Sequence, residues 1–407
     1  MVENNKSLKQ IIDFRKEKLN KIMEMGIDAY PQRYNPSHLS SEIINNYKAH
    51  KNKDVLVAGR IMSIRKMGKA SFFNIQDSDG RLQIFIKRDD IGEDNYDLFK
   101  LLDIGDFVGV SGFVFKTKVN EISVHAEKLT LLCKSIRPLP IVKEKDEATF
   151  DAFSDKEQRY RNRHLDLIVN SNIKDTFVKR TKIIKGIRDY LDELGFLEVE
   201  TPVLQPLYGG ANARPFTTHH NALDQKLFLR IADELYLKRL IIGGIDRVYE
   251  LSKDFRNEGM DRNHNPEFTM LEFYWAYADY KDNMDLVENM IKDVAKSVGS
   301  LMITWGEMKI DLSKPFQRKP IFELLKEATG RDISNLGADE LRKICKENNI
   351  QIEDDANYGQ ILDCLMSELV EPGLIQPTFV IDYPKEISPL AKKHRNGDPN
   401  LVERFEL

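Results

Sequence analysis

Two stretches of alternating side chains, residues 249–258 and 268–275, constrain the fold of this chain more than any other feature. Successive side chains of a strand point to opposite faces of a sheet, so each stretch predicts a strand with two different faces. The polar residues of the first strand share one parity: Glu250, Ser252, Asp254, Arg256 and Glu258. One face of the second strand carries Phe268, Met270, Glu272 and Tyr274. We therefore expect a strand pair with one apolar face and one face that joins an arginine, carboxylates and aromatic rings.

The residues alone leave two interpretations of this polar face open. An antiparallel hairpin with one solvent-exposed face is common and needs no ligand. Alternatively, an arginine among carboxylates beside an aromatic ring can hold a nucleotide and a substrate that bears an ammonium group.

The order of the residues closely resembles motif 2 of the class II aminoacyl-tRNA synthetases. The run from Phe255 to Gly259 matches the Phe-Arg-x-Glu element of the family's first strand, and the run from His264 to Tyr274 matches its second strand. Both runs are most similar to the lysyl branch of subclass IIb. Aspartyl enzymes differ after the Phe-Arg pair, and asparaginyl enzymes lack the second run.

Further toward the N-terminus, the apolar residues follow a period of two in five short segments between residues 55 and 124. Turn signals such as Asp79-Gly80 separate the segments. Five strands with a longer insert between the third and the fourth predict an OB-type β-barrel, a fold that binds oligonucleotides on one open face. The overall fold class is therefore α+β, a five-stranded OB-type barrel followed by a class II synthetase catalytic domain, an antiparallel sheet flanked by helices.

Four regions are expected along the chain. Residues 1–50 form an N-terminal helical extension with an amphipathic helix over 7–26, and residues 51–140 form the barrel. A linker at 141–157 precedes a catalytic domain at 158–407, with a helical insertion at about 283–375. Within it, a helix from about Ile173 to Leu194, a strand and Pro202 resemble motif 1, which builds the dimer interface in this family.

Composition narrows the partners and the compartment. The formal net charge is −4, so RNA contacts must come from local basic patches. The three cysteines are far apart and show no metal-ligand spacing, which is typical of a reducing cytosol and argues against a structural zinc site. No apolar run resembles a signal peptide or approaches the ~20 residues of a membrane span. We expect a cytoplasmic protein without a membrane partner.

The resemblance implies ATP-dependent activation of L-lysine to lysyl-adenylate and transfer of the lysyl group to the 3′ end of tRNA-Lys. Arg256 is the expected catalytic residue, because its planar fork can hold the lysine carboxylate and the α-phosphate together. A salt-bridged structural arginine is the alternative. For ATP binding the resemblance implies Arg256, Glu258, His264 and Phe268, and for lysine binding Gly210, Glu234, Arg256, Glu272 and Tyr274. Which acid contacts the α-amino group and which the ε-amino group stays open.

In the barrel, the resemblance points to Arg65, Phe72, Gln83 and Glu121 as the residues that read the uridine-rich anticodon of tRNA-Lys. Phe72 lies near basic residues, as a stacking platform beside phosphates would, but a core phenylalanine is the alternative. Asn120 stands where the family usually has a glycine, which makes the alignment of Glu121 the least secure.

No glycine-rich motif 3 with its arginine occurs in the chain, which ends where the family continues into further active-site strands. The acids that hold Mg²⁺ in the family are expected in that later part, so no metal ligand is predicted within this chain. We expect this chain to be catalytically incomplete while its barrel still binds tRNA. The full-length protein is expected to be a homodimer.

Three other functions are compatible with parts of the pattern. The chain could be a tRNA-binding protein without catalysis that uses only the barrel. It could lysylate a protein, although such relatives lack the anticodon barrel predicted at residues 55–135. It could also be an aspartyl- or asparaginyl-type enzyme on the same scaffold.

Overall fold

The computed structural model describes residues 7–140, 143–145, 148–150, 153–170 and 172–407, in two compact units. The first unit spans Met1–Lys174 and the second Asp175–Leu407. Helices α6 (Lys156–Arg161) and α7 (Arg163–Val169) group with the first unit. The domain boundary expected at residue 158 therefore stays a prediction.

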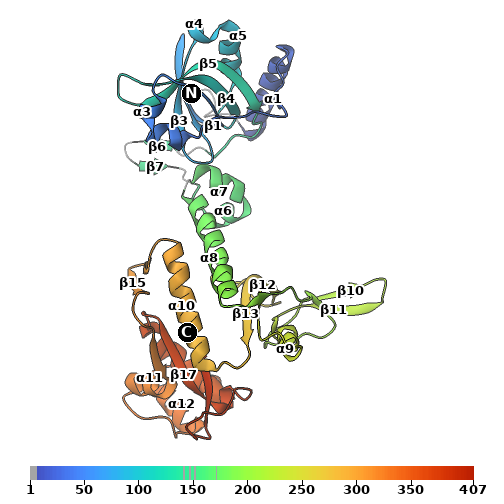
Figure 1. Ribbon diagram of the computed structural model, residues 1–407, viewed down its shortest axis with the longest axis vertical. Helices are drawn as coiled ribbons and strands as arrows, with labels where there is room; N and C mark the ends of the chain where they lie inside the picture. The colour runs from blue at the N-terminus through green and yellow to red at the C-terminus, as the bar shows by residue number, and fades with distance from the viewer. Residues whose placement is uncertain (1–6, 141–142, 146–147, 151–152, 171) are drawn as a thin grey trace. The chain divides into compact units, whose positions relative to one another are not determined.

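The first unit is built around the five-stranded closed barrel that the alternating pattern predicts (Figure 1). Its strands are β1 (Asp54–Met67), β2 (Ala70–Gln76), β3 (Arg81–Lys87), β4 (Phe107–Lys116) and β5 (Ile122–Cys133). They pair in the order β1-β2-β3-β5-β4, and only β3 and β5 run parallel. The inward residues of each strand, such as Phe73, Ile75 and Val110, are fully or almost fully buried in one hydrophobic core. This arrangement confirms the expected OB-type barrel.

The expected N-terminal helix is α1 (Leu8–Glu24). A capping box between Ser7 and Gln10 begins it, and Gly26 follows its end with a φ of +73°, which a glycine adopts without strain. Four further short helices surround the barrel: α2 (Ser40–Asn45), α3 (Tyr47–His50), α4 (Arg88–Ile91) and α5 (Glu93–Leu101).

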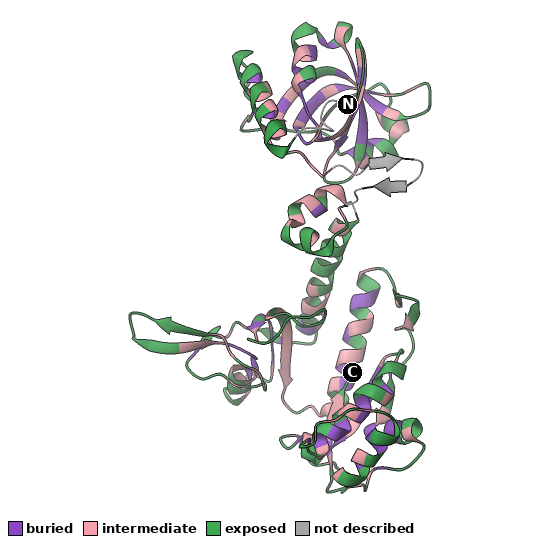
Figure 2. Cartoon of the chain, turned by 180° about the vertical axis from the view of Figure 1, so that it is seen from behind, coloured by how far each residue is buried: buried purple, intermediate pink, exposed green. Residues whose placement is uncertain are grey.

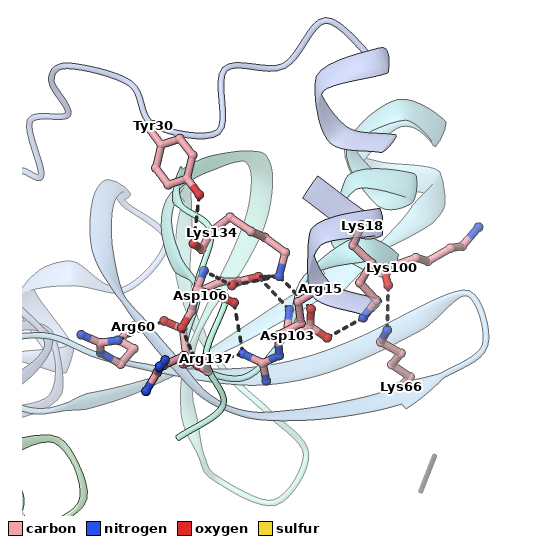
Figure 3. A network of polar contacts seen from close by, with 12 residues as sticks. Arg15, Lys18, Tyr30, Arg60, Lys66, Lys100, Asp103, Asp106, Lys134 and Arg137 are labelled. Atoms are coloured by element: carbon pink, nitrogen blue, oxygen red, sulfur yellow. Dashed lines mark hydrogen bonds and ion pairs between the residues drawn. The ribbon is translucent and has the colours of Figure 1, made fainter. Parts of the chain in front are cut away.

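A buried network of charges joins α1 to the barrel (Figure 3). The Lys134 ammonium is completely buried and lies 2.7 Å from Asp103 and 2.9 Å from Asp106. Lys18 of α1 pairs with the same Asp103, and the buried Arg15 donates to the carbonyl oxygen of Ser135 at 3.2 Å. Burial raises the pKa of Asp106 despite its lysine partner. The network therefore depends on Lys134 to neutralise two buried carboxylates.

The second unit contains the predicted strand pair, β12 (Arg247–Phe255) and β13 (Glu267–Trp275). A short strand, β8 (Leu197–Glu198), runs parallel to β12. The expected long helix is α8 (Ile173–Glu193), and most of its residues are exposed (Figure 2). Residues of α8 and of α10 (Tyr280–Ser297) pack against the apolar face of the strand pair.

A second group of elements lies beside this strand pair in the sequence. It comprises the small sheet β10-β11-β9, from β9 (Leu204–Gln205), β10 (Thr217–His220) and β11 (Gln225–Leu229), and the helix α9 (Glu234–Ile242). The helix makes contacts with both β12 and β13.

The region 283–375 is only partly the helical insertion that the sequence predicts. Its helices are the larger part of α10 and the whole of α11 (Ile321–Thr329), α12 (Ala338–Glu347) and α13 (Tyr358–Leu365), followed by a π-helical turn (Met366–Val370) and a 3₁₀ turn (Glu371–Gly373). It also holds three unpredicted strands, β14 (Met302–Trp305), β15 (Met308–Asp311) and β16 (Gln317–Pro320). β16 pairs with β17 (Thr378–Pro384), which pairs with β18 (Leu401–Glu406); a 3₁₀ turn (Lys385–Ile387) separates these two. Strands of four residues carry too little periodicity to be recognised from sequence.

Part of the linker expected at 141–157 lies outside the described residues, namely 141–142, 146–147 and 151–152. The described remainder includes the hairpin β6 (Lys143–Lys145) and β7 (Ala148–Phe150). Across the described ranges, no helix combines the length and the hydrophobicity needed to cross a membrane.

We predict that Lys134→Met destabilises the barrel unit by about 3–5 kcal/mol, because it leaves Asp106 buried without its cation and Asp103 with Lys18 alone. Hydrogen exchange of the β4 and β5 amides measures this change. The control is Lys100→Met, which removes an exposed ion pair with Asp97 and should change the free energy by less than about 1 kcal/mol. Equal protection in both variants would contradict the prediction.

Candidate functional site

The strand pair has the two faces that its alternation predicts. Glu250 lies opposite Glu272, Ser252 opposite Met270 and Asp254 opposite Phe268. On the other face, Tyr249, Leu251, Leu271, Phe273 and Trp275 join a hydrophobic cluster with α8 and α10. The strand β12 ends at Phe255, so the expectation that Arg256 and Glu258 continue it is wrong. Antiparallel pairing ends at the pair Phe255–Glu267, and residues 256–266 form the connecting loop.

The β12 side of the polar face is buried and its β13 side is half-buried, so it is not the solvent-exposed face of an ordinary hairpin. Glu250, Ser252 and Asp254 are 3%, 6% and 0% exposed. The carboxylates of Glu250 and Asp254 lie against the guanidinium of Arg230, at 2.6 Å and 3.3 Å. Arg230 also lies 3.1 Å from Asp233 and donates to the carbonyl oxygens of Lys253 and Thr201. This arginine fixes the carboxylates in place.

Sequence analysis did not identify Arg230. A signal was present, because three polar residues of one parity on β12 include two acids, and buried acids require a counter-cation. The sequence does not reveal which of the chain's many arginines supplies that cation. The segment of Arg230 reaches β12 only through folding: Phe255 donates its N–H to the carbonyl oxygen of Arg230 at 3.0 Å.

Four of the residues expected to bind lysine lie together beside the carboxylates that contact Arg230. The Tyr274 hydroxyl donates to Glu272 at 3.0 Å, and the backbone N–H of Asp233 donates to the same carboxylate at 3.2 Å. Glu234 follows directly at the start of α9. Gly210 packs against it so closely that a Cβ there would meet the Glu234 Cβ at 2.9 Å, and its φ is +91°. A glycine is therefore required at position 210.

Burial governs the protonation of this acidic group. Burial raises the pKa of Asp233 to about 6, and neighbouring Asp254 and Glu250 add to the effect. Burial also raises the pKa of Asp254 and of Glu272, and it raises that of Tyr274 well above its ordinary value. One Asp254 oxygen, Oδ2, is buried without a hydrogen-bond partner. The group carries more negative charge than Arg230 neutralises, which favours binding of a further cation.

Carboxylate oxygens of Asp233, Asp254 and Glu272 lie within 4.8 Å of one another. Oxygen ligands suit Mg²⁺, but the Arg230 guanidinium already lies against two of these three acids. A fixed positive charge so close repels a divalent ion more strongly than a singly charged ammonium group. The trio therefore does not fit a Mg²⁺ site.

Arg256 and Phe268 lie together, whereas the other two expected ATP contacts do not join them. The Arg256 guanidinium lies 5.1 Å from the centre of the Phe268 ring. Glu258 and His264 belong to the exposed loop between the strands. His264 has a side chain 75% exposed and pairs with Asp261 at 2.8 Å. Its hydrogen bond lowers the pKa of Asp261.

The four expected anticodon contacts lie on adjacent parts of the barrel. Arg65 pairs across the sheet with Phe72, and its guanidinium donates to Gln83 at 3.3 Å. Phe72 points away from the core, since it alternates with the buried Phe73. Glu121 lies in the β4–β5 turn, where Asn120 has a φ of +65°, a conformation that asparagine tolerates next after glycine. This explains how Asn120 occupies a position at which the family has a glycine.

The outward side of the barrel carries aromatic rings that sequence analysis did not single out. Phe72 lies 4.9 Å from Phe85, which in turn lies 5.9 Å from Phe115 and 5.0 Å from His125 between ring centres. We call Phe72, Phe85, Phe113, Phe115 and His125 the aromatic patch. Its members could have been found from strand parity, because each alternates with buried residues along its strand. Half-buried aromatic rings of this kind, on the outward side of a barrel, can stack on unpaired bases.

We predict that Asp233→Asn removes a pH dependence of the stability of the second unit. The raised pKa means that the folded state binds a proton below about pH 6 that the unfolded chain binds only near pH 4. Stability therefore rises as the pH falls through this window. Between pH 8 and pH 5 the wild type should gain about 1 kcal/mol more than Asp233→Asn.

Urea unfolding followed by tryptophan fluorescence measures this difference, because both tryptophans, Trp275 and Trp305, belong to the second unit. An identical pH dependence in the two proteins would contradict the assignment of a raised pKa to Asp233.

Comparisons with known proteins agree with this architecture. The family model described as tRNA synthetases class II (D, K and N) matches residues 155–407, and that of an OB-fold nucleic acid binding domain matches residues 55–132. Lysine–tRNA ligases from two strains of Porphyromonas gingivalis are 51% and 50% identical over 404 residues, which cover 97% of this chain and 70% of each relative. That of Carboxydothermus hydrogenoformans is 48% identical over 406 residues, 99% of this chain and 81% of the relative. The chain belongs to the class II aminoacyl-tRNA synthetases of the D, K and N group.

Proposed function

We propose that the chain is a lysine–tRNA ligase, which activates L-lysine with ATP to lysyl-adenylate and transfers the lysyl group to the 3′ end of tRNA-Lys. One observation carries the proposal: the Arg256 guanidinium lies 5.1 Å from the centre of the Phe268 ring, and the strand of Phe268 also carries Glu272, whose charge interacts with that of Glu234. Relatives about 50% identical that are named lysine–tRNA ligases support it.

Lysine selection rests on the excess negative charge of this site. The carboxylates of Glu234 and Glu272 pair with the two ammonium groups of lysine, and Tyr274 holds Glu272 in position. A buried carboxylate left without a cation is costly, so an amino acid that lacks the second ammonium group is rejected. Gly210 leaves its backbone next to Glu234, where the substrate amino group binds.

Activation requires two anions to meet, because the lysine carboxylate attacks the α-phosphorus of ATP and pyrophosphate leaves. Arg256 holds both groups through its planar fork and stabilises the charge that develops on the phosphate oxygens. Phe268 stacks on the adenine, and Glu258 and His264 bind the nucleotide when the loop between the strands closes over it. Mg²⁺ accompanies ATP and neutralises phosphate charge, and no carboxylate described here is assigned to it.

The aromatic patch supports a role for the barrel in binding the anticodon of tRNA-Lys. Phe72 stacks on a base, while Arg65, Gln83 and Glu121 read base edges. Apolar residues exposed on α8 and on the segment after it support a homodimer interface; they include Phe177, Val178, Ile183 and Leu197. Aminoacylation for protein synthesis places the enzyme in the cytoplasm.

We predict that the chain binds a hydrolysis-resistant lysyl-adenylate analogue at least 100-fold more tightly than the aspartyl or asparaginyl analogue. Glu272→Gln should weaken the lysyl complex by 30-fold or more, because a buried ion pair is lost. Arg256→Lys should weaken it about tenfold, since a point charge replaces the fork. Calorimetry measures the affinities of the wild type for the analogues and of both variants for the lysyl analogue, with Glu307→Gln on an exposed turn as the control. Tighter binding of the aspartyl analogue would overturn the lysyl assignment.

We predict that Phe72→Ala weakens binding of a tRNA-Lys transcript by about fivefold to 100-fold, the loss of one base stack. The same variant should lose the preference over a transcript whose anticodon uridines are replaced by cytidines. Filter binding measures both, and Met23→Ala, an exposed apolar residue of α1, is the control. Unchanged affinity and preference in Phe72→Ala would contradict the placement of the anticodon.

A further inference from the structure

A second group of potential metal ligands lies in the first unit, away from the active site in sequence. It consists of His38, Glu42 and His50, in which one ring nitrogen of each histidine and one carboxylate oxygen lie within 4.8 Å of one another. The His50 Nε2 lies 3.8 Å from the Glu42 Oε1, and the two imidazole rings have their centres 4.8 Å apart. The catalytic proposal uses none of these residues.

The fold holds the three side chains from three independently anchored points. Glu42 belongs to α2, whose Ile43 is fully buried in the barrel core. His50 ends α3, and Tyr47 of the same helix packs against that core. His38 precedes α2, where the backbone is tied to β1 by a 2.8 Å hydrogen bond from Ser37 N–H to the Leu56 carbonyl oxygen. A site built on such anchored elements is largely preformed.

The hydrogen bonds of Ser37 are compatible with the tautomer of His38 that binds metal. The Ser37 hydroxyl accepts from the Leu56 N–H at 2.9 Å, and its oxygen lies 3.3 Å from the Leu56 carbonyl oxygen and 2.7 Å from the His38 Nδ1. When the hydroxyl donates to the Leu56 carbonyl oxygen, it accepts from the Nδ1–H of His38, and the Nε2 of His38 carries a free lone pair. An outer hydrogen bond of this kind is the usual partner of a metal-bound histidine.

We propose that His38, Glu42 and His50 form a binding site for a divalent transition-metal ion of the Zn²⁺ class. Two imidazoles and a carboxylate are a ligand set that Zn²⁺ uses, with water in the fourth position. Tetrahedral coordination brings ligand atoms to about 3.4 Å from one another, so they must approach by up to about 1.4 Å from the 4.8 Å limit. Glu42 can move this far because its side chain is 49% exposed.

The bound ion would link the segment before α2 to α2 and α3, and so fasten the N-terminal extension on the barrel. Its ligands belong to the first unit, whereas the strand pair belongs to the second. This ligand set contains no cysteine, so the spacing of the three cysteines does not reveal it.

The test is a Co²⁺ titration of the untagged full chain after chelator treatment, followed by visible absorption and by Zn²⁺ competition. The wild type should bind one equivalent of Co²⁺ that Zn²⁺ displaces, and Zn²⁺ should raise its melting temperature. His38→Ala and His50→Ala should each lose at least tenfold in affinity, and Ser37→Ala about tenfold. His164→Ala, which removes an exposed histidine of α7 in the same unit, should bind as the wild type does.

Glu42→Gln keeps the proposal testable if a histidine variant fails to fold, because the exposed Glu42 side chain is not needed for the core. It should also lose at least tenfold in Co²⁺ affinity. No saturable Co²⁺ uptake by the wild type would overturn the proposal, and so would uptake that Glu42→Gln and both histidine variants retain.

Discussion

The ion cluster around Arg230 is the interaction on which the rest of the second unit depends. One guanidinium, almost fully buried, lies against Asp233, Glu250 and Asp254 from two separate segments of the chain. Without it, three carboxylates would be buried together unpaired, a state that proteins avoid by protonation or unfolding. With it, the segment that leads into α9 is locked onto β12, and Asp233 presents its backbone N–H to Glu272.

Arg230 cannot neutralise all of the carboxylates around it, and the remaining negative charge favours binding of a cationic substrate. Burial, together with repulsion among acids that outnumber the cations of this face, raises the pKa values of Asp233, Asp254 and Glu272. A substrate that brings two ammonium groups relieves the repulsion among them. Burial of uncompensated acids lowers the stability of the fold, and binding of a diamino acid relieves this cost. Such a local loss of stability is expected at functional sites.

Residues with strong local patterns were predictable from sequence, and those that depend on long-range packing were not. Strand alternation predicted the barrel, the strand pair and both of its faces, and the resemblance supplied Arg256, Phe268, Glu272 and Tyr274. Arg230 was missed because its partners are 3 to 24 residues away and its own neighbours are unremarkable in pattern. The strands β14 to β16 were missed because four residues do not define a period. In the sequence, Arg256 and Glu258 follow the alternation of polar residues on β12, although the pairing of β12 with β13 ends at Phe255.

The central claim is that buried negative charge selects the side-chain ammonium group of lysine. Its most direct test compares the dissociation constants of the lysyl-adenylate analogue and the norleucyl analogue, which keeps the four side-chain carbons of lysine but carries hydrogen in place of the ammonium group. The account predicts at least 100-fold weaker binding of the norleucyl analogue, because one buried carboxylate then loses its partner. Equal affinities for the two analogues would contradict it.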